Sequence, residues 1–110
     1  MPKSATESGA SPQDADTCEL CGRHPVVTTI HHLVPREEGG RHLPTARLCP
    51  ACHRQIHALF TNRDLVRLEL TTIERLKAAP EIASYLKWIV KQPPGVNPTV
   101  RKSARVRGKR

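Results

Sequence analysis

The sequence contains few aromatic residues and no long apolar stretch. Among 110 residues, Phe60, Tyr85 and Trp88 are the only Phe, Tyr or Trp side chains, and ten prolines interrupt regular structure. A chain of this length has room for one domain, and with so little apolar material it needs a metal ion or disulfides to hold its core. No apolar run approaches the roughly 20 residues that span a bilayer. We therefore expect a soluble, cytoplasmic domain without a membrane segment.

Acidic residues are missing from the end of the chain. Residues 93–110 carry six Lys and Arg and no Asp or Glu, within a formal net charge of +8. Residues 1–17 are rich in Ser, Ala, Asp and Pro and do not resemble a signal peptide. We predict that residues 1–17 and 93–110 are disordered and that the basic tail binds a polyanion such as nucleic acid. The alternative is a solubilising tail with no specific partner.

The four cysteines form two Cys-x-x-Cys pairs, Cys18 with Cys21 and Cys49 with Cys52. In a cytosolic chain, two such pairs are typical of a zinc site and not of a disulfide framework. Gly22 follows the first pair, where a tight turn often needs a positive φ. A thioredoxin-like redox motif would explain one pair but not the second. We predict a structural Zn²⁺ bound by all four thiolates, which leaves no open position for a substrate.

All six histidines lie between residues 24 and 57. His31 and His32 are adjacent, whereas His53 and His57 stand four residues apart directly after Cys52. That second spacing places both rings on one face of a helix. A C2H2 zinc finger is excluded because it separates its second cysteine from its first histidine by about 12 residues.

The pattern of apolar and turn residues predicts a hairpin followed by helices. Residues 26–33 predict a strand, 38–41 a turn, 45–48 a return strand and 51–60 a helix. Thr61 or Asn62 begins a second predicted helix that runs to about Ala78, and Pro80 begins a third that stops before the Pro-Pro-Gly at 93–95. We expect residues 61–92 to pack as a helical appendage on the core formed by residues 18–60.

Three segments together carry a family pattern. They are Cys-Glu-Leu-Cys-Gly-Arg from residue 18, Thr-Ile-His-His-Leu-Val-Pro-Arg from residue 29 and Leu-Cys-Pro-Ala-Cys-His-Arg-Gln-Ile-His from residue 48. Over residues 18–60 the chain resembles the HNH endonucleases, also called ββα-metal or His-Me finger nucleases. The resemblance implies an α+β fold, a small zinc-stapled ββα-metal finger of hairpin plus helix, here followed by two C-terminal helices. It also implies a nuclease with one catalytic metal between the hairpin and the helix.

Carried over by position, the resemblance implies roles for four histidines. His31 binds a catalytic divalent metal (Mg²⁺, Mn²⁺, Ni²⁺ or Zn²⁺), His32 is the general base, and His57 with His53 completes the metal site. Phosphodiester hydrolysis needs an activated water and a cation that offsets the charge building on the phosphate oxygens. A histidine suits proton transfer near neutral pH. Because adjacent strand residues face opposite sides, the strand must end or bend at His31 and His32. A second interpretation of His53 is that it only orients its neighbours or packs.

One position departs from the family pattern. The middle letter of HNH is an asparagine five residues before the second cysteine pair, and here Pro44 occupies that position. That asparagine helps to hold the loop that positions the general base, so its loss predicts impaired activity. His42 and Thr45 are the candidates to replace it.

The sequence is compatible with three classes of function. The first is a metal-dependent HNH endonuclease acting on double-stranded or nicked DNA, with RNA as an open alternative. The second is a catalytically silent zinc-knuckle protein that binds nucleic acid through its basic tail, and the third is a purely structural or regulatory module. A mere binder has no need of His31, His32 and His57 together, so the histidines favour the nuclease. The sequence does not indicate an oligomeric state.

Overall fold

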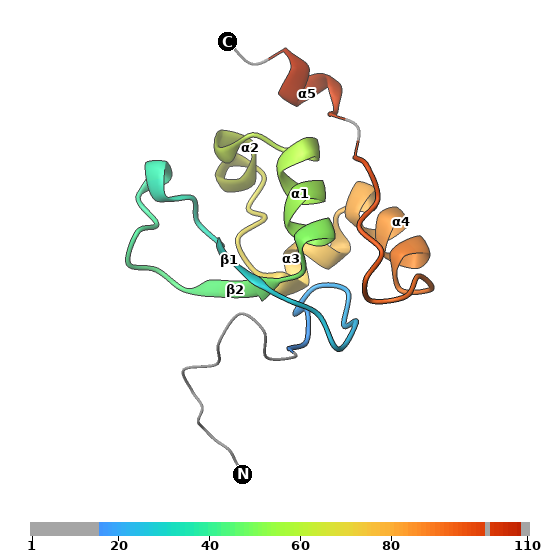
Figure 1. Ribbon diagram of the computed structural model, residues 1–110. Helices are drawn as coiled ribbons and strands as arrows, with labels where there is room; N and C mark the ends of the chain where they lie inside the picture. The colour runs from blue at the N-terminus through green and yellow to red at the C-terminus, as the bar shows by residue number, and fades with distance from the viewer. Residues whose placement is uncertain (1–15, 101, 109–110) are drawn as a thin grey trace.

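The computed structural model describes residues 16–100 and 102–108 and has an α+β fold, which confirms the predicted class (Figure 1). In chain order the elements are strand β1 (Thr29–His32), 3-10 helix η1 (Arg36–Glu38), strand β2 (Thr45–Leu48) and helices α1 (Pro50–Leu59), α2 (Asn62–Arg67), α3 (Ile73–Ala78), α4 (Pro80–Ile89) and α5 (Ala104–Arg107). Helix α3 packs on α4, α2 on η1, and α5 on α1. None of the described helices is long and apolar enough to cross a membrane.

Strands β1 and β2 form an antiparallel hairpin in which Thr29 pairs with Leu48 and His31 with Ala46. Because side chains alternate along a strand, these four residues share one face, and His31, Ala46 and Leu48 are buried on it. The first strand is shorter than the predicted span of 26–33. Val26 forms only an isolated bridge with residue 16.

The beginning of the described chain is held against the hairpin. Asp16 exchanges both backbone hydrogen bonds with Val26, and its carboxylate accepts hydrogen bonds from Thr28 and from Arg47, the latter an ion pair at 2.9 Å. Residues 16 and 17 therefore differ from the predicted disorder of residues 1–17, while residues 1–15 lie outside the described residues.

The loop between the strands contains two glycines, each with its own steric reason. Gly39 has φ = 92° and ends η1. A Cβ on Gly40 would lie 1.8 Å from the carbonyl oxygen of Val34, so no larger residue fits there without moving backbone. The Leu33 N–H donates to the Pro44 carbonyl and closes the loop at its base.

Helix α1 begins at Pro50, one residue before the predicted start. Proline suits this position because the first N–H groups of a helix have no partner within it. Cys49 is the N-cap residue, so the second cysteine pair lies at the start of α1. Ala51, Cys52, Ile56 and Ala58 are buried, and this face holds α1 against the rest of the core.

The predicted helix over residues 61–78 is two helices, α2 and α3. Thr61 and Asp64 form a reciprocal capping box that starts α2. The chain then turns through Glu69 at φ = 59°, with the Leu70 N–H donating to the Leu65 carbonyl and the Glu69 N–H to the Val66 carbonyl. This is the hydrogen-bond pattern of a Schellman motif. It buries both leucines, and that burial is the physical reason for the break.

The helices after α1 supply core that the hairpin unit lacks. Leu65, Leu76, Ile82 and Ile89 are fully buried in one cluster with Leu48, Ile56 and Phe60. At about 25 cal/mol per Å² of apolar surface, burying each such side chain contributes roughly 1.5–3 kcal/mol. The hairpin, α1 and the helices up to α4 therefore share a single core.

Disorder is predicted over residues 93–110, but residues 93–100 and 102–108 contact the core; residues 101, 109 and 110 lie outside the described residues. Arg23 is buried and donates to the carbonyls of Pro93 (2.7 Å) and Val96 (3.1 Å). Farther along, Ser103 donates from its N–H to the Ala58 carbonyl (2.8 Å) and from its hydroxyl to the Leu59 carbonyl (2.7 Å). The last carbonyls of a helix have no partner within it. Ser103 donates to two of these carbonyls of α1 and thereby holds α5 against that helix.

Candidate metal centres

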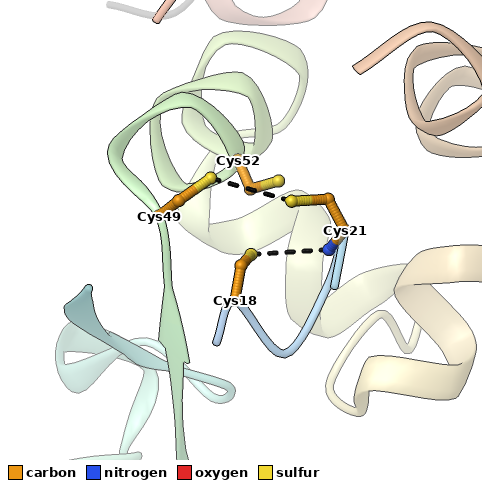
Figure 2. Close-up of side chains that lie close together, drawn as sticks. All are labelled: Cys18, Cys21, Cys49 and Cys52. Carbon is orange, nitrogen blue, oxygen red and sulfur yellow. Dashed lines mark hydrogen bonds between the residues drawn. The ribbon is translucent and has the colours of Figure 1, made fainter. Parts of the chain in front are cut away.

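The four cysteines converge from two segments of the chain (Figure 2). Cys18 and Cys21 lie on a tight turn in which Gly22 has φ = 79°, which confirms the positive φ expected there, and its N–H donates to the Cys18 carbonyl. Cys49 and Cys52 lie at the start of α1. The four sulfur atoms lie within 4.8 Å of one another, whereas a tetrahedral zinc site with bonds of about 2.3 Å has sulfur–sulfur edges of about 3.8 Å. The thiols are positioned to form a metal site.

The chemistry of this thiol cluster also calls for a cation. Hydrogen bonds among the thiols, the one with Cys18 first in each case, lower the pKa of Cys49 far below its ordinary value and raise that of Cys52 far above it. Four sulfurs this close cannot all ionise without a positive charge between them. Arg23 donates to Cys49 Sγ and the Tyr85 hydroxyl to Cys52 Sγ, both at 3.4 Å. These two donors offset part of the negative charge of a thiolate set and orient its members.

Three histidines form a second cluster beside the hairpin. His31 comes from β1 and His53 and His57 come from α1, with ring centroids 5.1–5.4 Å apart. One ring nitrogen from each lies within 4.8 Å of the others. The i, i+4 spacing on α1 and the buried face of β1 bring the rings together. The arrangement could hold a metal ion.

Of the three clustered histidines, His31 is the one whose ring nitrogens are buried without a hydrogen-bond partner in the described part of the chain. Its side chain is only 1% exposed, and neither ring nitrogen has a hydrogen-bond partner among the described residues. An unpartnered buried polar group costs about 1–3 kcal/mol. Burial, together with the neighbouring His57, His53 and His32, lowers the pKa of His31 to about 4. The ring is therefore neutral near pH 7, which is the form that binds metals.

His53 is oriented by a hydrogen bond from the hairpin. The Thr29 hydroxyl lies 2.6 Å from His53 Nδ1 and donates its proton to the Leu48 carbonyl at 3.4 Å. With the hydroxyl proton directed at Leu48, His53 Nδ1 is the donor toward Thr29 and Nε2 keeps a free lone pair; this is the tautomer that suits a metal ligand. A hydrogen bond of this kind fixes the tautomer of metal-binding histidines. Burial lowers the pKa values of His53 and His57 as well, so all three rings favour the neutral form.

His32 stands apart from the three-histidine cluster but borders the same cavity. It is the last residue of β1 and is half-buried, so the strand ends where the sequence requires it to end or bend. The cavity has a volume of about 490 Å³, and its lining includes His31, His32, His53 and His57. The structure thus brings all four predicted histidines to one cavity, separate from the four cysteines.

Neither predicted replacement for the missing asparagine reaches this cavity. Pro44, His42 and Thr45 are exposed, and none of them lines it. Asn62, at the start of α2, does line it, and its Nδ2 donates to Glu37 Oε1 of η1. The sequence identified Asn62 only as a helix start, because its distance of 18 residues from Pro44 gives no local signal. Thr29 and Arg23 were missed for the same reason: their partners lie far along the chain.

A hairpin and a helix that position a thiol cluster and a histidine cluster define a ββα-metal finger. The family model described as HNH endonuclease matches residues 18–59. The chain is 56% identical over 82 residues to the uncharacterized protein YisB of Bacillus subtilis, covering 74% of this chain and 81% of that protein. It is 28% identical over 75 residues to the type IV methyl-directed restriction enzyme EcoKMcrA of Escherichia coli, covering 59% of this chain but only 27% of that enzyme. No solved structure matches the chain.

The chain belongs to the HNH endonuclease family, which confirms the resemblance seen in its sequence. Membership supports a nuclease type of function and nucleic acid as the substrate.

Proposed function

We propose that this protein is a metal-dependent endonuclease that hydrolyses phosphodiester bonds in DNA. The observation that carries the proposal is His31, a buried neutral histidine without a partner among the described residues, facing two further neutral histidines on α1. Such a donor set has no purpose in packing, because an apolar residue would fill the same space without an unpaired polar group. Family membership supplies the reaction class.

His31, His53 and His57 would hold the catalytic divalent metal. Imidazole ligands suit Ni²⁺ and Zn²⁺ better than Mg²⁺ and Mn²⁺, which prefer oxygen, so Ni²⁺ and Zn²⁺ are expected to support activity more readily than Mg²⁺ and Mn²⁺. When bound, the cation supplies positive charge beside the phosphate oxygens. In the tautomer in which His53 Nδ1 donates to Thr29, the lone pair of Nε2 is available for the metal.

His32 is proposed as the general base. Its position at the end of β1 places it at the cavity without making it part of the three-histidine cluster. A histidine there accepts a proton from a water molecule as its oxygen attacks the phosphorus atom; the bond from phosphorus to the leaving sugar oxygen breaks, and that oxygen takes up a proton from solvent. General-base catalysis of this kind contributes about 10²–10⁴-fold to a rate.

The four cysteines are proposed to bind one structural Zn²⁺. A complete set of thiolates gives a closed tetrahedral site, which stabilises the fold but offers no position for substrate. Reduced cysteine pairs of this kind are expected in the cytoplasm, and we infer that location for the protein.

A silent nucleic-acid-binding protein is the second candidate, and one observation favours it. Pro44 occupies the family's asparagine position, and it is exposed and outside the cavity. The two candidates agree on nucleic acid as the partner, including RNA as an alternative to DNA, and differ only in whether the histidines perform hydrolysis.

Plasmid nicking separates the two candidates. Supercoiled DNA is incubated with the protein and with Mg²⁺, Mn²⁺, Ni²⁺ or Zn²⁺ in turn. His32→Ala should slow cutting by about 10²-fold or more while keeping metal affinity, whereas His57→Ala should weaken metal binding and cutting together. His42→Ala, at an exposed histidine outside the cavity, is the matched control and should cut like the parent. A His32→Ala variant that cuts at the parent's rate with saturating metal would refute the assignment of the base.

A further inference from the structure

A second cavity adjoins the one that holds the histidines. It has a volume of about 570 Å³ and lies among η1, α2 and α5. Glu37 and Asn62 line both cavities and are hydrogen-bonded to each other, so the second cavity lies next to the histidine cavity, on the other side of this pair and toward α5. We name the part of this second cavity lined by Arg63, Arg67 and Arg105 the arginine groove.

The arginines of this groove have donors to spare, while most of its acids are already paired. Asp64 accepts hydrogen bonds from the Thr61 backbone and from Arg67, and Glu37 accepts one from Asn62. Arg67 is 65% exposed and uses only one of its nitrogens in that pair. Arg63 is exposed, and its side chain makes no hydrogen bond or ion pair within the described part of the chain. A guanidinium has five donors, so these two side chains retain unused donors facing the groove.

Arg105 has a different role from the other two arginines. Its guanidinium lies 4.9 Å from the centroid of the Phe60 ring and donates to Glu81 at 3.1 Å. It is therefore already engaged, and it forms the wall at the α5 end of the groove. Glu38 is the one lining carboxylate without a hydrogen bond to any described residue. It would repel an anion in the groove.

We propose that the arginine groove binds the phosphodiester backbone of the nucleic acid strand beside the phosphate that is cut. The proposal rests on the proposed function, because it takes the histidine cavity as the place of cutting. Arg63 and Arg67 stand four residues apart on α2, about 5–6 Å between their Cβ atoms, a separation that suits neighbouring phosphates of one strand. Guanidinium groups bind phosphate oxygens in pairs of hydrogen bonds. An acidic protein would meet the same charges, but the histidine cavity directly beside the groove favours a nucleic acid strand, which can lie across both.

The test measures DNA affinity across a salt series in a His32→Ala background without added divalent metal, so that cutting of the bound DNA is suppressed. A fluorescein-labelled duplex is titrated with this protein and with the same protein carrying Arg63→Gln and Arg67→Gln. Loss of two phosphate contacts should flatten the slope of log affinity against log salt by about 1.8, at ~0.9 for each contact with duplex DNA. The control carries Arg75→Gln and Lys77→Gln on α3, removes the same charge from exposed positions outside the groove and should keep the slope.

A change of the opposite sign makes the test sharper. Glu38→Gln removes the unpaired carboxylate and should strengthen DNA binding at low salt. An unchanged slope in the arginine variant, or an equal change in the α3 control, would overturn the proposal. Polyglutamate serves as the probe for an acidic protein partner, and an arginine variant that loses as much affinity for polyglutamate as for DNA would also overturn it.

Hydrolysis of bis(4-nitrophenyl) phosphate separates this proposal from the proposed function. This small diester has no neighbouring phosphates, so the arginine variant with His32 intact should hydrolyse it at the parent's rate. If the arginine variant hydrolysed the small diester as slowly as it cut DNA, the arginines would be acting on the histidine site, and the proposal for the groove would be wrong. A parent that hydrolyses neither DNA nor the small diester would refute the proposed function, while the salt slopes would still decide whether the groove binds DNA.

Discussion

Acidification should destabilise this protein through His31. Its pKa is lowered from 6.5 to about 4, chiefly by burial. Because the folded state resists protonation, the unfolded chain takes up the proton first, and stability is lost as the pH falls from 6.5 toward 4. The linkage relation gives a loss of about 2 kcal/mol between pH 7 and pH 5 and about 3 kcal/mol by pH 4. Below about pH 4 both states are protonated and the loss levels off.

Urea unfolding of the parent and of His31→Leu, at pH 7 and pH 5 without added divalent metal, measures this effect. Leucine fills the buried space without a titrating group, so the parent should lose about 2 kcal/mol more than the variant over this interval. Comparing the two proteins cancels the thiols and the other groups that titrate in both. His42→Gln, at an exposed histidine, should follow the parent. If the difference in free energy between parent and His31→Leu were the same at both pH values, the reasoning about His31 would be wrong.

Three further predictions concern residues that stabilise the fold: the cysteines, Ser103 and Glu69. Replacing Cys49 and Cys52 with serine should abolish zinc binding and folding together. Metal analysis with circular dichroism checks this, and a folded, zinc-free double variant would contradict it. Ser103→Ala removes the hydroxyl that bonds the Leu59 carbonyl and should cost about 1 kcal/mol in urea unfolding, whereas no change would mean that the C-terminal segment does not support α1. Glu69→Gly relieves a left-handed residue at φ = 59° and should stabilise the protein by about 1 kcal/mol; a lower Tm would refute that expectation.

Local sequence patterns are sufficient for the return strand of the hairpin and for α1. The predicted return strand over residues 45–48 coincides with β2, and the predicted helix over 51–60 differs from α1 by one residue at each end. Strand alternation and helix caps act over a few neighbouring residues, so they can be read without knowing the rest of the fold.

The differences arise where a distant contact overrides the local pattern. Glycine is the usual sequence signal for a Schellman turn, and here Glu69 occupies that position, so the sequence gives no signal. The turn forms because it buries Leu65 and Leu70. The basic composition of the C-terminal segment predicts disorder, yet Ser103 meets carbonyls of α1 that lie 44 residues earlier in the chain. Neither contact is visible in a window of neighbouring residues.

The sequence by itself determined the two cysteine pairs, because each Cys-x-x-Cys needs only its own tight turn or helix start to direct two sulfurs at one point, and the tertiary structure brings the two pairs together. The family pattern likewise singled out the four histidines. Only the tertiary structure decided how these histidines meet. The pairing of His31 with Ala46 turns that ring toward α1, and the Thr29 hydroxyl orients His53 beside it. The structure also placed Asn62, and not His42 or Thr45, at the cavity. Strand register and the packing of α2 on η1 join residues that are far apart in the chain, and no local rule specifies such contacts.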